Sequence, residues 1–401
     1  MLTRRELLSS TALVALAPTV PAFLTRTARA AVPARDTRLL VVIHLDGGND
    51  GINTLVPFKD DGYSKHRAAL RIEAGRLVKV DGVTGLHPAM TEMGALLERG
   101  HLAIVQGVGY PNPSRSHFEG TAIWHTARMK KDERHDLGWL GRAYDEPGAA
   151  PRDTAAAVYV GSGETPVALR GRRAVASALT RPEDFVLDPA ADGHLLASSG
   201  EAPGELAAFV RRHAVDGHAT AGRMAEVLKE NNGNGSYPAT ELATHLRLIA
   251  RLVKAGAGAR VYYARQGGYD THAAQAPAHH QLLSALSGAV SAFLKDLAAA
   301  KLADRVAVLC FSEFGRTVRD NGSGGTDHGT AGPVFLAGEK VNGGLVGETP
   351  SLLDLDPVHG DLKVGIDFRR VYATLLEDWL GLRGKDVLAG TFELLPLFRR
   401  A

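Results

Sequence analysis

The chain has 401 residues, of which 45% are hydrophobic and 22% charged, a composition close to that of soluble globular proteins. It excludes disordered, fibrous and disulfide-stapled chains, and the single cysteine, Cys310, can form no disulfide within the chain. The formal net charge is +2 and no basic run is interleaved with aromatic residues, so no nucleic acid is expected as a partner.

The first thirty residues have the features of an export signal. Arg4 and Arg5 precede an apolar stretch over residues 12–24, and a small-x-small pattern ends at Ala30. The paired arginines predict export through the twin-arginine translocase, cleavage after Ala30, and a periplasmic or secreted location. A membrane anchor is the alternative, but two prolines interrupt the stretch, which is shorter than the ~20 residues that span a bilayer. No transmembrane segment is expected in the mature chain.

The mature chain alternates between expected strands and helices. Apolar runs short enough for buried strands lie, in chain order, at Leu39–Leu45, 102–108, 260–264, Val306–Phe311 and 333–336. Segments with helical spacing lie at 90–97, 118–124, 239–255, 278–300 and 367–380. This alternation predicts an α/β fold in three layers, with a central, mostly parallel sheet flanked by helices. Residues from about 128 to 235 lack it and predict a cap or peripheral lobe within a domain of residues 31–401.

Polar side chains cluster where the expected strands end. In open α/β sheets ligands bind outside the carboxyl ends of the strands, so polar loops after four strands are expected to meet on one rim. The side chains that could hold a divalent metal there, with Zn, Mn, Mg and Ca all open, are Asp46, Asp270, His272, Glu313, Asp327 and His328. Each has another interpretation, as a turn former, a solvated loop histidine or a helix cap. Together they favour a metal site.

Five segments resemble one known family. They are LDGGNDG at 45–51, SRSHFEG at 114–120, GGYDTH at 267–272, FSEFGRT at 311–317 and GTDHG at 325–329. These are similar to segments of the exported bacterial family known as domain of unknown function 1501, which is grouped with the alkaline-phosphatase-like superfamily of sulfatases, phosphodiesterases and phosphomutases. The resemblance covers nearly the whole mature chain. It implies an alkaline-phosphatase-like three-layer fold and metal-assisted transfer or hydrolysis of phosphate or sulfate esters.

Several ligand roles follow from that resemblance. Asp46 resembles the superfamily's first metal-ligating Asp, at the end of the opening strand. Asp270 and His272 fall where an Asp and a His bind one metal, although the superfamily more often spaces them further apart. His328 resembles the late metal-binding His.

The chain departs from the superfamily at two places. An Asp-His pair should follow a late strand, but Glu313 and Phe314 stand there, and Phe314 cannot bind a metal. A complete two-metal site would need Asp327 or another group as a replacement. The tripeptide PSR at 113–115 resembles the end of the sulfatase signature, yet Pro111 stands where that signature has its Cys, which excludes a formylglycine-dependent sulfatase.

The nucleophile is therefore sought among hydroxyl groups. Ser114 and Ser116 are candidates, because a nearby divalent cation lowers the pKa of a hydroxyl. Arg115 and Arg316 could bind a tetrahedral oxyanion with their planar guanidinium groups. N-capping of the following helix is the alternative role for both serines.

Two functions from different classes remain. The first is an exported metal-dependent hydrolase that acts on an anionic small-molecule or glycan ester. The second is a catalytically degenerate envelope protein that binds carbohydrate or a protein partner. Bound metal would favour the first, and a folded, metal-free chain would favour the second.

Overall fold

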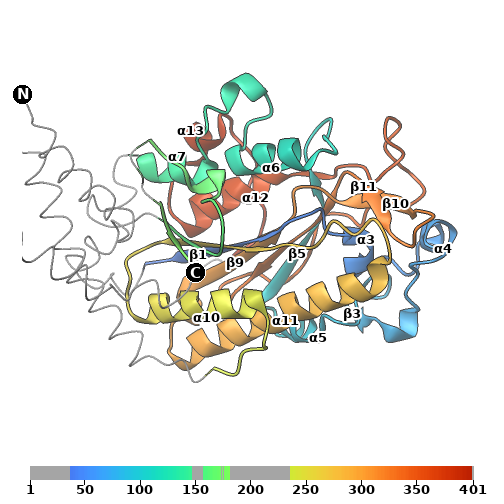
Figure 1. The fold of residues 1–401 in the computed structure, drawn as a ribbon, viewed down its shortest axis with the longest axis horizontal. Coiled ribbons are helices and arrows are strands. Elements are labelled where there is room, and N and C mark those ends of the chain that lie inside the picture. Colours follow the sequence, from blue (N-terminus) through green and yellow to red (C-terminus); the bar gives the residue numbers. More distant parts are fainter. Residues whose placement is uncertain (1–36, 147–156, 173, 175, 181–234, 400–401) are drawn as a thin grey trace, which may run out of the picture.

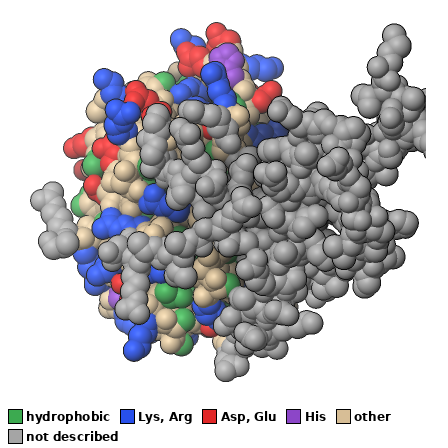
Figure 2. All heavy atoms as spheres, turned by 90° about the vertical axis from the view of Figure 1, so that its left-hand side faces the viewer, with side chains coloured by type: hydrophobic (Ala, Val, Ile, Leu, Met, Phe, Trp, Pro, Cys, Tyr) green, Lys and Arg blue, Asp and Glu red, His purple; other side chains and the backbone are tan. Residues whose placement is uncertain are grey.

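The computed structural model describes residues 37–146, 157–172, 174, 176–180 and 235–399, which form three layers with a sheet in the middle (Figure 1). The expected signal at residues 1–30 lies outside these residues, so export stays a prediction. In Figure 2 basic and acidic side chains are interspersed over the described part of the face shown. This mixture agrees with the small net charge of the whole chain.

The middle layer of the described chain is a nine-stranded sheet. Its strands lie in the order β13 (Gly344–Val346), β5 (Leu102–Gly109), β12 (Gly332–Ala337), β9 (Val306–Phe311), β1 (Leu39–Leu45), β8 (Val261–Gln266), β6 (Ala157–Val160) and β7 (Ala176–Leu179), with β14 (Ile366–Asp367) beside β5. All pairings are parallel except those of β12, which is antiparallel to β5 and β9. The predicted mostly parallel sheet is confirmed.

Strand β1 is buried on both faces, which explains its apolar sequence, broken only by His44. Val41 and Ile43 pack into the core on one face of the sheet, whereas Leu40 and Val42 pack into the core on the other face. Burying each of these side chains contributes roughly 1.5–3 kcal/mol to the stability of the fold. A shift of the strand register by one residue would turn the side chains of each face to the opposite face. The register of β1, and with it the position of the loop that begins at Asp46, is therefore well determined.

Helices cover both faces of the sheet (Figure 1). One face carries α5 (Thr91–Glu98), α10 (Glu241–Lys254) and α11 (Gln275–Ala299). The opposite face carries α6 (His117–Thr126), α7 (Trp139–Asp145), α12 (Phe368–Thr374) with its π-helical continuation Leu375–Trp379, and α13 (Gly384–Leu388). The three-layer α/β architecture predicted from the sequence is confirmed.

Within the described residues α11 alone is long and apolar enough to cross a bilayer. Its inner side belongs to the main core, where Leu283, Leu286 and Phe293 are fully buried. It packs against α10 and α5. The position of α11 is that of a core helix.

Short elements connect these strands and helices. They are α3 (Gly51–Thr54), α4 (Asp61–His66), β2 (Leu55–Val56), β3 (Val78–Lys79), β4 (Gly85–Leu86), β10 (Arg316–Asp320), β11 (Thr326–His328) and the 3₁₀ turns Ala74–Arg76, Lys131–Glu133, Val167–Leu169 and Ala303–Arg305. The hairpin of β10 and β11 brings Arg316 opposite His328.

The strand expected at 333–336 forms as β12 and is antiparallel to its neighbours. Asp327 and His328, which precede this strand in the sequence, therefore lie at the same rim as the carboxyl ends of the parallel strands. Within the expected lobe at about 128–235, β6 and β7 are strands of the central sheet. Residues 181–234 of that lobe lie outside the described chain, and the domain assignment as a whole stays a prediction.

Candidate metal centre at the rim of the sheet

The carboxyl ends of β1, β5, β8 and β9 meet at one rim, because these strands all run in the same direction. The antiparallel β12 starts at that rim, so β11, which precedes it, also lies there. The loop after β5 leads to the first residue of α6, His117. Topology therefore brings together segments that are up to about 280 residues apart in the chain.

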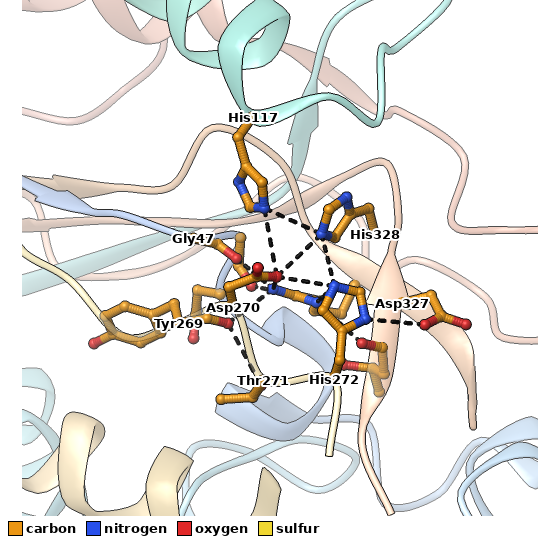
Figure 3. Close-up of polar contacts among 12 residues, drawn as sticks. Gly47, His117, Tyr269, Asp270, Thr271, His272, Asp327 and His328 are labelled. Atoms are coloured by element: carbon orange, nitrogen blue, oxygen red, sulfur yellow. Dashed lines mark hydrogen bonds and ion pairs between the residues drawn. The ribbon is translucent and has the colours of Figure 1, made fainter. Parts of the chain in front are cut away.

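Three histidines and one aspartate point toward a common centre (Figure 3). His328 Nε2 lies 3.1 Å from His117 Nε2 and 2.9 Å from His272 Nε2. Asp270 Oδ1 lies 3.0 Å from the Nε2 atoms of His272 and His328 and 3.4 Å from that of His117. The potential ligand atoms of His117, Asp270 and His328 all lie within 4.8 Å of one another. We call His117, Asp270, His272 and His328 the histidine cluster.

The second nitrogen of each ring faces a hydrogen-bond acceptor. His117 Nδ1 lies 2.8 Å from Glu313 Oε1, and His272 Nδ1 lies 3.0 Å from Asp327 Oδ1. His328 Nδ1 lies 2.8 Å from the backbone carbonyl oxygen of Arg115. Because ionised carboxylates and carbonyls can only accept, each Nδ1 carries a proton and donates it. In the neutral ring the lone pair is then on Nε2.

The contacts between Nε2 atoms are favourable when positive charge, from a metal ion or a shared proton, lies between the rings. Two neutral imidazoles that meet through Nε2 lone pairs at 2.9–3.1 Å cannot hydrogen-bond to each other. A tetrahedral ion bound roughly 2.0–2.1 Å from each nitrogen would hold its ligands about 3.3–3.4 Å apart, slightly more than most of the 2.9–3.4 Å separations in the cluster. Histidines that bind metals typically donate the other ring N–H to a carboxylate or a carbonyl. The donor set of the cluster therefore fits a metal ion.

The acids around the cluster are ionised. Burial alone would raise the pKa of Asp270, but the hydrogen bond and the positive charge of Arg316 lower it to about 2. Burial would likewise raise the pKa of Glu313, and the hydrogen bonds from His117 and His44 lower it well below its usual value. The hydrogen bond to Glu313 raises the pKa of His117, which makes that ring a more basic ligand.

Arg316 anchors the loops of the rim. Its side chain is fully buried and donates to the backbone carbonyls of Gly47, Gly48 and Tyr269, and to Asp270 Oδ1 at 2.6 Å. Another N–H donates to the carbonyl of Thr326 at 3.0 Å. A guanidinium used in this way holds Asp270 in place and has no free edge for a substrate anion, a role different from the one expected from the sequence.

Phe314, which takes the place of an expected ligand, packs against the histidine rings. Its centroid is 4.8 Å from that of His117 and 4.9 Å from that of His328. Gly48 has a φ of +76°, and a Cβ there would come within 2.3 Å of the Phe314 ring. The glycine in the loop after β1 thus allows both a left-handed backbone conformation and the close approach of Phe314.

Asp46 lies at the rim but outside the histidine cluster. Its carboxylate pairs with Arg265. Together with His44 and Glu313 it forms a second group of potential ligand atoms. Glu313 also accepts from the backbone N–H of Gly47 at 2.9 Å and from a ring nitrogen of His44 at 3.2 Å.

Neither candidate serine contacts the histidine cluster among the described contacts. Ser114 Oγ accepts from the backbone N–H of Ser116 at 3.3 Å. Ser116 is the N-cap residue of α6, but its side chain makes no capping hydrogen bond. Arg115 is partly exposed, with Nη1 3.4 Å from the carbonyl oxygen of His328 and 3.5 Å from Asp361 Oδ2. Of the two expected anion-binding arginines, Arg115 is the one whose side chain is accessible at this rim, because Arg316 is buried.

Of the six expected metal ligands, the structure brings Asp270, His272 and His328 to one point. It places Glu313 and Asp327 behind the rings, as acceptors for His117 and His272. His117 was not assigned a role from the sequence, although it lies in the segment at 114–120. Its position at the start of the helix that follows β5 was the signal that could have identified it.

A family model described as a protein of unknown function, DUF1501, matches residues 65–392. No curated protein matches the chain.

Solved structures show weak similarity. The C-terminal periplasmic domain of EcEptC from Escherichia coli, in complex with Zn, is 9% identical, with coverage of 76% of this chain and 74% of that one and a TM-score of 0.38. The lipoteichoic acid synthase LtaP from Listeria monocytogenes is 8% identical, with coverage of 86% and 80% and a TM-score of 0.35. A 2-O GAG sulfatase is 10% identical, with coverage of 88% and 75% and a TM-score of 0.38. Similarity at this level assigns neither an activity nor a substrate to this chain.

Proposed function

The chain belongs to the DUF1501 family of proteins of unknown function, and we propose that it is an exported, metal-dependent hydrolase of phosphate or sulfate esters. The observation that carries the proposal is the convergence of three imidazole Nε2 atoms and one carboxylate oxygen, with every Nδ1 held by an acceptor. The resemblance of the rim segments to alkaline-phosphatase-like enzymes supports the substrate class.

In this proposal His117, Asp270, His272 and His328 hold the ion. Three nitrogens and one oxygen suit Zn²⁺ better than Mg²⁺ or Ca²⁺, which prefer oxygen ligands, and leave Mn²⁺ as the second candidate. Glu313 and Asp327 fix the ring orientations and increase the basicity of His117 and His272.

Exposure of the ligands supports a catalytic site over a purely structural one. The side chains of Asp270 and His272 are 49% and 43% exposed, and those of His117 and His328 are 31% and 23% exposed. Structural metal sites are closed by protein ligands, whereas catalytic sites keep a position open to substrate. When bound, the ion would supply positive charge beside the ester oxygens and lower the pKa of an adjacent hydroxyl or water.

The remaining roles are assigned to groups next to the cluster. The backbone carbonyl of Arg115 accepts a hydrogen bond from His328. Its partly exposed guanidinium would bind the anionic group of the substrate. Ser114 and Ser116 stay candidate nucleophiles, and a water molecule is the alternative, since neither hydroxyl contacts the cluster in the described chain. Substrates would be small anionic esters or glycan esters in the periplasm or outside the cell.

A panel of aryl phosphate monoesters, phosphate diesters and sulfate esters, each with and without added Zn²⁺ or Mn²⁺, tests this function. The wild type should hydrolyse at least one ester class in a metal-dependent way, and His117→Ala should lose more than about 100-fold of that rate. The matched control is His101→Ala, which immediately precedes β5 and lies at the amino end of that strand, away from the rim. Hydrolysis that survives both chelation and His117→Ala would refute the proposal.

The binding-protein alternative has one specific observation in its favour. Phe118, next to His117, is 91% exposed, and an exposed aromatic ring beside a polar site is suited to stacking on a sugar ring. Bound metal without turnover on any ester, together with metal-dependent binding of a glycan, would support this alternative.

A further inference from the structure

Asp361 is a buried carboxylate next to the accessible arginine of the rim. It lies in the segment between β13 and β14, and its side chain is only 3% exposed. Its Oδ1 accepts from the backbone N–H of Val318 at 3.2 Å, whereas its buried Oδ2 has no hydrogen-bond partner among the described residues. Oδ2 lies 3.5 Å from Arg115 Nη1. The two side chains therefore form a charge pair without a hydrogen bond.

This pairing leaves Arg115 with free donors but little net charge. Burial raises the pKa of Asp361, while the Val318 N–H and the charge of Arg115 oppose that shift, so the ionised carboxylate depends in part on Arg115. Arg115 Nη1 also lies 3.4 Å from the carbonyl oxygen of His328. The Nε–H and Nη2–H groups of Arg115 have no partner in the described part of the chain, and together they match two oxygens of an ester anion.

Three more carboxylates lie around the histidine cluster, against one more guanidinium group. Asp270 accepts from Arg316 at 2.6 Å. The other two carboxylates, Glu313 and Asp327, accept from ring nitrogens of the cluster. Together with the pair described above, the site has four carboxylates and two guanidinium groups.

The charged groups next to the site cancel in pairs. Asp46 pairs with Arg265, and Glu119 accepts two hydrogen bonds from Arg134. His44 donates through Nε2 to one of the four carboxylates, and its buried Nδ1 has no partner among the described residues. A proton on that Nδ1 would be a buried donor without an acceptor, so the ring is neutral. These groups therefore add no net charge to the site.

A divalent ion in the cluster would bring the net charge of the site to about zero, because the ion and two guanidinium groups together match four carboxylates. An ester with one negative charge is attracted by the ion and by Arg115. A second negative charge gains little more attraction, since each positive group already has a carboxylate beside it, and it gives up more hydration on entering the site. The balance of charge favours a monoanion over a dianion.

Resting on the proposed function, we propose that the site selects esters that carry one negative charge, namely phosphate diesters and sulfate monoesters, over the dianion of a phosphate monoester. Asp361 is a positioning residue in this selection, because it touches no substrate and acts by offsetting the charge of Arg115. Arg115 then contributes two directed donors and little excess positive charge.

Binding of analogues that an ester hydrolase cannot cleave tests this selection without turnover. Phenylphosphonate carries two negative charges at about pH 8.5, as a phosphate monoester does, whereas its methyl ester and benzenesulfonate carry one. Isothermal titration calorimetry of the full chain loaded with Zn²⁺ should show that each monoanion binds several-fold more tightly than phenylphosphonate. The methyl ester represents phosphate diesters and benzenesulfonate represents sulfate esters, so the tighter of the two identifies the preferred class.

Asp361→Asn removes the charge and keeps an oxygen for the Val318 N–H. It should tighten the binding of phenylphosphonate relative to both monoanions by roughly three- to tenfold, because a dianion interacts twice as strongly with the lost charge. The matched control is Asp354→Asn, at a 75% exposed aspartate of the same segment, which pairs with Lys363. It should keep the ratio of affinities found in the wild type.

The proposal is overturned if phenylphosphonate binds the wild type as tightly as the monoanions do, if no analogue binds, or if Asp361→Asn leaves the ratio of affinities unchanged. A merely structural role of Asp361 would weaken the binding of all three analogues alike and would count against the proposal too. Should Asp361→Asn fail to fold, the ratio in the wild type decides. Hydrolysis of the ester panel tests the proposed function separately, and preferred hydrolysis of a phosphate monoester would keep that function while contradicting the selection.

Discussion

Each histidine of the cluster is held at both ring nitrogens, and this double constraint distinguishes the cluster from solvated loop histidines. The Nδ1 atoms donate to Glu313, Asp327 and a backbone carbonyl, and the Nε2 atoms face one another. A loop histidine in water has no reason to adopt a fixed tautomer. A metal ion explains both halves of the arrangement at once.

The role of Asp327 gives a prediction at this scale. Asp327→Ala removes the acceptor for His272 Nδ1, so the ring loses its fixed orientation and the affinity for metal should fall by roughly 10–100-fold. Competition with a chelator of known affinity measures the change. Because Asp327 is 61% exposed, the free energy of unfolding without metal should be little affected.

A carboxylate without a contact to the cluster provides the comparison. Asp304, exposed in the turn Ala303–Arg305, can be changed to Ala with the same loss of charge. If Asp304→Ala weakens metal binding as much as Asp327→Ala does, the effect is one of net charge and the proposed contact with His272 is not its cause.

The sequence indicated the residue types of the site better than their roles. Asp270, His272 and His328 were expected together because each lies beside an apolar run. His117 was not, since seven residues separate it from the end of β5 and it does not directly adjoin an apolar run. Asp46 was expected as a ligand from its place after a strand and by resemblance, but its contact with Arg265 depends on side-chain geometry that no local pattern encodes.

At the scale of elements, apolar runs predicted the strands and alternation predicted the layers. β1 and β9 have the predicted bounds because both are buried on two faces, and apart from His44 in β1 all their residues are apolar. Hydrophobic periodicity cannot give strand direction, so the antiparallel β12 was not foreseen. β6 and β7 have four residues each, too few to produce a period in a stretch rich in glycine and alanine.

The buried face of α11 gives a prediction about pH. Burial lowers the pKa of His279 to about 4, and its Nε2 lies 2.9 Å from Asn49 Oδ1. The unfolded chain binds this proton near pH 6.5, so the folded chain is stabilised fully above that pH and loses up to about 3 kcal/mol as the pH falls to about 4. His279→Gln should reduce the loss of stability between pH 7 and pH 4.5, measured by urea denaturation in the presence of chelator.

His101→Gln, a change at a half-buried histidine before β5, serves as the reference for this experiment. It should leave the pH dependence as in the wild type. An unchanged slope in His279→Gln would show that the buried ring does not contribute to acid sensitivity.

At the scale of the whole molecule, the fold explains how segments that are distant in the sequence build one site. The N-terminal segment predicts the compartment in which the protein acts, which is the periplasm or the cell exterior. If Arg4 and Arg5 are recognised by the twin-arginine translocase, changing both to Lys should leave the precursor in the cytoplasm. Fractionation followed by immunoblotting measures this, with Arg26→Lys, beyond the apolar stretch, as the control. Normal export of the double variant would contradict the prediction.

The central claim is that the histidine cluster holds a metal ion, and elemental analysis of protein purified without added metal tests it most directly. The wild type should contain about one divalent ion per chain, Zn²⁺ before Mn²⁺, because three nitrogens and one oxygen form its site. His328→Ala should lose most of that metal and His101→Ala should keep it. A folded wild type without metal, or equal metal content in the wild type and His328→Ala, would contradict the account.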